Sequence, residues 1–170
     1  MIIAILTLIL ITLVPALELR MSIPVGIFSM QDELSWQMVI LICAISNIIL
    51  GWCVFAVIGP VFTIIRKWAW FENRIWPFLE RTQHKIHPYV EKYGYIGVAL
   101  FIGIPLPGSG VYTGAFGSYL LGMKKRHFAI ANVLGVLIAA TAVAILCMMI
   151  LHGAVGEDSL LARLFIKKHS

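Results

Sequence analysis

The stretch FIGIPLPGSG, residues 101–110, lies in the middle of an uncharged segment that covers residues 93–123. Its two prolines and three glycines are strong helix breakers, so the segment cannot form one continuous helix. The apolar arms on either side, residues 93–104 and 111–122, would each form a helix of about 18 Å, roughly half of a bilayer core. The segment therefore predicts a re-entrant hairpin, which enters a membrane and returns to the same side.

Two further uncharged stretches, residues 34–65 and 127–156, each exceed the ~20 residues that a helix needs to cross a bilayer. The 170 residues are 61% hydrophobic and only 12% charged, whereas soluble domains carry ~25% charged residues. This composition excludes a soluble globular domain. We expect an all-α, multi-pass protein of the cell membrane with transmembrane helices at residues 34–65 and 127–151.

The charges indicate the topology. Basic residues crowd the segments 66–92 and 124–126, which the positive-inside rule places in the cytoplasm. Both ends of the hairpin at residues 93–123 are then on one face, as a re-entrant hairpin requires. These clusters adjoin membrane segments, so we expect membrane lipids as partners and no nucleic acid. The other loops carry the acidic residues Asp32, Glu33, Glu157 and Asp158.

The N-terminal half repeats this pattern in the opposite orientation. Residues 1–14 form one apolar arm, residues 15–24 carry Pro15 and Pro24 as the break, and residues 25–30 lead back to the acidic loop. Each half would then be a re-entrant hairpin followed by a long helix, an inverted repeat of the kind found in secondary transporters.

This pattern predicts a domain organisation. The first half covers residues 1–65, with its hairpin at 1–31, and the second half covers residues 93–170, with its hairpin at 93–123 and a C-terminal tail after its long helix. Between the halves, residues 66–92 have the apolar periodicity of an amphipathic, interfacial linker. Because broken helices in a membrane need surrounding protein, we expect a homodimer or higher oligomer.

Glu18 and Arg20 are the ionisable residues that the predicted topology places at membrane depth. Such residues are costly there and usually line a pathway for substrate or protons. Glu18 is the candidate proton carrier, and Arg20 the candidate ligand of an anionic group. The alternative is that both residues lie near a surface and only pair with each other.

The second break offers a candidate binding site for an anion or a polar headgroup. Backbone N–H groups and hydroxyls around Ser109, Gly110 and Thr113 would lie at the start of a half-helix. The glycines could equally serve close helix packing. The residues assigned to the structural turns of the two hairpins are Pro15, Pro24, Pro105, Pro107, Gly108 and Gly114.

Other polar residues suggest no catalytic chemistry. Asn47 and Asn132 lie inside the two long helices and are expected to form interhelical hydrogen bonds. Cys43, Cys53 and Cys147 lack metal-ligand spacing and read as small core residues. Since no nucleophile motif, metal set or paired carboxylates are present, we expect neither an enzyme nor a cofactor.

The motifs PALELRMSIPVG, residues 15–26, and GYIGVALFIGIPLPGSGVYTG, residues 94–114, resemble the small multidrug export protein family, a relative of the DedA superfamily. The resemblance covers roughly residues 10–145. It implies two re-entrant hairpins in inverted orientation, and proton-coupled transport or flipping of lipid phosphates. Glu18 resembles the essential acidic residue of the first hairpin in that superfamily. The arginines of its second hairpin are replaced here by Ile104 and Gly110, which leaves the positive charge to Arg20.

The leading hypothesis from the sequence is thus a secondary transporter or lipid flippase, proton-coupled, for a small amphipathic or anionic lipid-like cargo. A passive channel and a non-transporting membrane scaffold are the alternatives. The identity of the cargo cannot be read from the residues.

Overall fold

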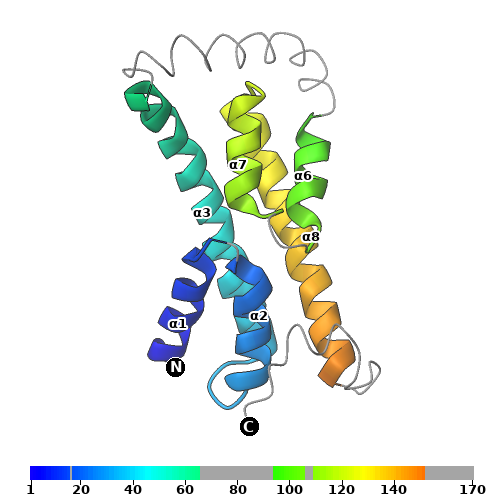
Figure 1. Ribbon diagram of the computed structural model, residues 1–170. Coiled ribbons are helices and arrows are strands. Elements are labelled where there is room, and N and C mark those ends of the chain that lie inside the picture. Colours follow the sequence, from blue (N-terminus) through cyan, green and yellow to red (C-terminus); the bar gives the residue numbers. More distant parts are fainter. Residues whose placement is uncertain (16, 66–93, 106–108, 152–170) are drawn as a thin grey trace. The chain divides into compact units, whose positions relative to one another are not determined.

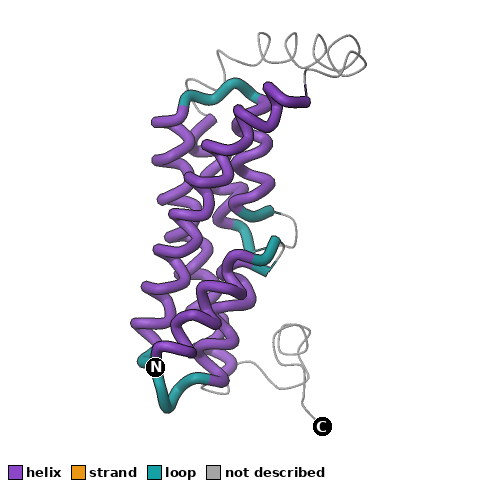
Figure 2. The backbone as a smooth tube through the Cα atoms, turned by 90° about the vertical axis from the view of Figure 1, so that its left-hand side faces the viewer, coloured by secondary structure: helices purple, strands orange, loops and turns teal. Residues whose placement is uncertain are grey.

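The structure is a computed structural model that describes residues 1–15, 17–65, 94–105 and 109–151. Within these residues the chain is all-helical, with short connecting loops (Figures 1 and 2). The predicted linker at 66–92 and the tail after residue 151 lie outside the described residues. The helices are α1 (Ile2–Leu13), α2 (Glu18–Ser29), α3 (Trp36–Ile65), α6 (Tyr95–Gly103), α7 (Val111–Leu120) and α8 (Lys125–Leu151).

Two of these helices, α3 and α8, are long and apolar enough to cross a membrane, over Trp36–Ile64 and Lys125–Leu151. Neither helix carries a charged residue in its interior, and the basic residues Lys124, Lys125 and Arg126 lie exposed at the start of α8. For the described residues, the prediction of an all-helical chain with two long apolar helices is thereby confirmed.

The chain divides into two compact units, residues 1–47 with 138–170, and residues 48–137. In the first unit, α1 and α2 form an antiparallel helical hairpin (Figure 1). A Cβ atom added at Gly26 on α2 would lie 2.3 Å from Cγ1 of Val39 on α3 and 3.2 Å from Cδ2 of Leu8 on α1. Glycine is therefore needed at this level, where three helices approach closely.

The turn of the first hairpin is shorter than the sequence predicts. α1 ends at Leu13 and α2 begins at Glu18, so Pro15 lies in the turn as expected. Pro24, however, lies inside α2, and its assignment to the turn is wrong. A proline inside a helix removes one backbone hydrogen bond, a loss that close packing and nearby hydroxyls can offset in membrane proteins. Pro24 is buried within the unit, which places it in such surroundings.

In the second unit, α6 and α7 form a second helical hairpin (Figure 1). α6 ends at Gly103, and α7 begins at Val111, so the break falls over the predicted stretch, with Pro105 in it. Pro107 and Gly108 lie outside the described residues.

Gly114 is not part of this turn, because it lies inside α7. A Cβ atom there would lie 2.6 Å from Cγ1 of Ile102 on α6, and one at Gly135 on α8 would lie 2.7 Å from Cβ of the same Ile102. The close-packing role that the sequence left open is therefore confirmed for Gly114. Gly117 has nothing within 4 Å of such a Cβ atom, so packing does not require glycine there.

Candidate functional site

Glu18 and Arg20 lie on the first turn of α2, directly after the turn of the first hairpin. Their side chains form an ion pair, with 3.8 Å between Arg20 Nη1 and Glu18 Oε2. Although both are ionisable, only 3% of Glu18 and 8% of Arg20 is exposed. The structure thus confirms that Glu18 and Arg20 pair with each other, and both charged groups are buried in the protein.

The backbone of Glu18 explains how this pair forms. Residues two apart on a regular helix point to nearly opposite sides and do not meet. Glu18 has a φ of 46°, and no other non-glycine residue in the described ranges has a positive φ. This left-handed conformation costs about 1–3 kcal/mol, and residues held in it cluster at functional sites. On a regular helix the carboxylate of Glu18 would point away from Arg20. The left-handed backbone of Glu18 departs from helix geometry at this residue.

A layer of small polar side chains lies one helical turn from Glu18. The hydroxyl groups of Thr12 on α1 and Ser22 on α2 are 2.8 Å apart, and the Ser22 hydroxyl donates to the Glu18 carbonyl over 3.2 Å. The thiol of Cys43 on α3 interacts with both hydroxyls. All three side chains are fully buried. The layer ties α1, α2 and α3 together and holds the backbone of Glu18 through Ser22.

The second hairpin uses its hydroxyl donors within its own turn. Ser109 Oγ donates to the Ile104 carbonyl over 2.7 Å, and Thr113 Oγ1 donates to the Gly110 carbonyl over 3.1 Å. Gly110 is the N-cap residue of α7 and has an extended backbone. The three residues that the sequence assigned to this binding site are therefore close together, but in this arrangement the two hydroxyl hydrogens stabilise the turn.

The two buried asparagines, Asn47 and Asn132, differ in their hydrogen bonds. Asn132 Nδ2 on α8 donates to the Ile48 carbonyl on α3 over 2.9 Å, which confirms an interhelical hydrogen bond. Asn47 on α3 is 1% exposed, and within the described structure neither its Oδ1 nor its Nδ2 has a hydrogen-bond partner. The interhelical bond predicted for Asn47 is therefore absent from the described structure.

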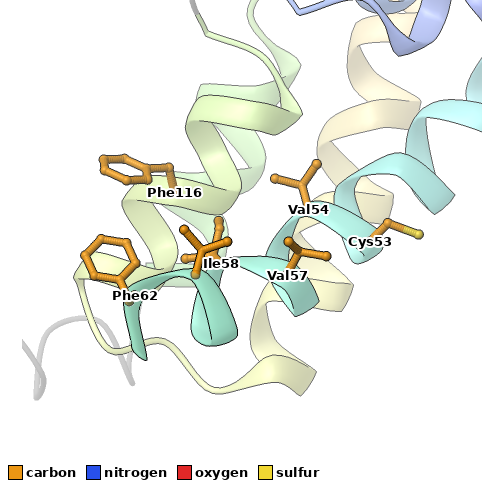
Figure 3. A pocket seen from close by; sticks show the side chains of 7 residues that line it. Cys53, Val54, Val57, Ile58, Phe62 and Phe116 are labelled. Atoms are coloured by element: carbon orange, nitrogen blue, oxygen red, sulfur yellow. The ribbon is translucent and has the colours of Figure 1, made fainter. Parts of the chain in front are cut away.

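The second unit also contains an apolar pocket of about 520 Å³. Figure 3 shows side chains of α3 and Phe116 of α7 around it. Its lining is wholly apolar, so it suits a hydrocarbon chain or an apolar ring better than a polar group. The lining residues are Cys53, Val54, Val57, Ile58, Val61, Phe62 and Phe116.

Among the described residues, no group of three or more His, Cys, Asp or Glu side chains could hold a metal ion.

The sequence analysis did not predict the Thr12–Ser22–Cys43 layer, because its members come from three helices. The one feature of the sequence that points to this layer is the four-residue spacing of Glu18, Ser22 and Gly26, which places these residues on one face of α2.

Comparison with known proteins matches residues 18–142 to the model of one family, described as "Putative small multi-drug export protein". No curated protein and no solved structure matches the chain. The matched segment begins at Glu18 and includes the hairpin of α6 and α7. Since it covers well over half of the 170 residues, the chain belongs to this family of small multi-drug exporters, whose description is that of a membrane transporter.

Proposed function

We propose that the protein is a proton-coupled secondary transporter or lipid flippase that moves a small amphipathic or anionic, lipid-like cargo. Its family description supports export across a membrane. The observation that carries the proposal is the buried Glu18–Arg20 pair in a strained turn. Buried ionisable groups are expensive in membrane proteins and are retained mainly where substrates or protons pass.

In this proposal the two side chains have different roles. Glu18 alternates between a carboxylate paired with Arg20 and a protonated, neutral acid. Protonation releases Arg20 from its partner, and the guanidinium then holds an anionic oxygen of the cargo through its planar fork. Cargo binding and proton binding are thereby coupled, because the binding of either one changes the charge of the site to which the other binds.

We further propose that both hairpins are re-entrant and form an inverted repeat, as in the DedA superfamily. The element order supports this, since α1 and α2 precede α3 in the same way that α6 and α7 precede α8. Turn backbone at membrane depth requires a cover of protein or water. A homodimer or higher oligomer in the cell membrane, in contact with lipids, would provide it. Neither catalysis nor nucleic-acid binding is part of this proposal.

The test is cargo movement in vesicles that contain the purified full-length protein. The probe is an alkyl phosphate with a fluorescent label, which external dithionite destroys only in the outer leaflet. A gradient of one pH unit should shift the probe between leaflets by up to about tenfold for one coupled proton. An equal distribution with and without the gradient would remove proton coupling, and no movement above protein-free vesicles would remove transport of this class of cargo.

A further inference from the structure

The packing of α2 against α3 follows a regular register. The two helices are joined by residues 30–35 and run antiparallel, so facing positions move in opposite directions along the chain. Gly26 faces Val39, and one turn further Ser22 contacts Cys43. If this spacing continues for one more turn, position 18 on α2 lies opposite position 47 on α3.

The successive levels of this packing become more polar toward the turn of the hairpin. The level of Gly26 and Val39 is apolar, and the level of Ser22 and Cys43 carries a hydroxyl and a thiol. Glu18 and Asn47 are both buried, and this spacing would place them together at the next level. α1 has ended at Leu13, before this level, so it adds no polar group here.

We propose that Asn47 is the third polar residue of the Glu18–Arg20 site and binds the polar group of the cargo with its amide. A buried amide without a hydrogen bond destabilises a protein, so most buried polar groups are paired. Within the described structure both ends of the Asn47 amide lack a partner, and the register of α2 and α3 would place Asn47 at the level of Glu18. The amide is therefore poised for a group that enters the site.

The chemistry of the amide narrows the class of ligand. Nδ2 donates hydrogen bonds and Oδ1 accepts them, so an ideal ligand offers both an acceptor and a donor. Arg20 favours a negatively charged acceptor. A singly protonated phosphate monoester at the end of an apolar chain meets both requirements, since it has anionic oxygens and one O–H group. This inference rests on the proposed function and adds a specificity-determining residue to it.

The experiment measures binding of labelled dodecyl phosphate to the full-length protein in nanodiscs, together with the thermal midpoint of unfolding. Asn47→Leu keeps the branching of the side chain but removes both polar ends. We expect it to weaken binding roughly tenfold while the midpoint stays the same or rises, because an unpaired buried amide is lost. Asn47→Asp should weaken binding further, since it replaces the donor by a negative charge.

Asn132→Leu is the matched control, because Asn132 is equally buried but its Nδ2 donates a hydrogen bond to the Ile48 carbonyl. It should lower the midpoint and leave the affinity unchanged. Wild-type affinity in Asn47→Leu would overturn the inference, and so would a fall in its midpoint like that of Asn132→Leu.

The Arg20→Lys variant separates this inference from the proposed function. If Arg20→Lys weakens binding and Asn47→Leu does not, only the role of Asn47 fails. If Arg20→Lys binds as tightly as the wild type, the proposed anion site fails.

Discussion

Glu18→Gln should abolish the pH-driven shift of the cargo between leaflets while cargo exchange without a gradient continues. Glutamine resembles the protonated acid in shape and charge, so the variant keeps the state that releases Arg20 but cannot give up a proton. A gradient of one pH unit should then shift the distribution less than twofold, against the roughly tenfold expected for one coupled proton in the wild type. The measurement is dithionite accessibility of the labelled alkyl phosphate with and without the gradient.

Two variants control this result. Glu18→Asp keeps an ionisable carboxyl group and should retain part of the coupling. The charge swap Glu18→Arg with Arg20→Glu keeps a pair of opposite charges. Recovery of coupled transport by the swap would contradict the assigned roles, because a proton carrier and an anion ligand are not interchangeable.

Gly51→Ala should destabilise the protein strongly. A Cβ atom at Gly51 would lie 2.4 Å from Oδ1, 2.6 Å from Nδ2 and 2.7 Å from Cγ of Asn132. Asn132 is fully buried and holds Ile48, so it cannot move aside without losing that hydrogen bond. Overpacking costs about 1–3 kcal/mol and a broken buried hydrogen bond about 1–3 kcal/mol more, so we expect a loss of roughly 2–6 kcal/mol in total. Thermal or denaturant unfolding of the variant and the wild type in detergent measures this loss of stability.

The matched control is Gly97→Ala on α6, where nothing lies within 4 Å of an added Cβ atom. It should change stability little. Asn132→Ala should relieve the clash, so the double variant Gly51→Ala with Asn132→Ala should be more stable than the sum of the two single effects predicts. Simple additivity would contradict a direct conflict between the two side chains.

The sequence was sufficient to predict the long helices and the breaks between the short ones. Uncharged apolar runs predict α3 and α8, because each run is longer than the ~20 residues that a helix needs to cross a bilayer. The break around Pro105 follows from the density of helix breakers. Pro24 shows the limit of that argument, because a proline stops a helix only where packing and local hydrogen bonds do not offset the lost bond.

The candidate site was predictable in part. Glu18 and Arg20 stood out because charged residues are rare in apolar segments. The difference between Asn47 and Asn132 could not be predicted, since both are asparagines inside apolar helices. It depends on the register between helices, which brings Asn132 to a carbonyl of α3 and leaves the Asn47 amide without a hydrogen-bond partner in the described structure. The positive φ of Glu18 also depends on the tertiary packing around the turn.

Hairpins that enter the membrane and return would place Glu18 and Arg20 at membrane depth, and the proposed function depends on this topology. Single cysteines at Lys85 and Lys125, in a chain whose native cysteines are replaced by serine or alanine, test it with an impermeant thiol reagent in oriented vesicles. Both positions should react only from the cytoplasmic side, while a cysteine at Asp32 should react only from the opposite side. Labelling of the Lys85 and Lys125 positions from opposite sides would show that the segment between them crosses the membrane, and would contradict the account.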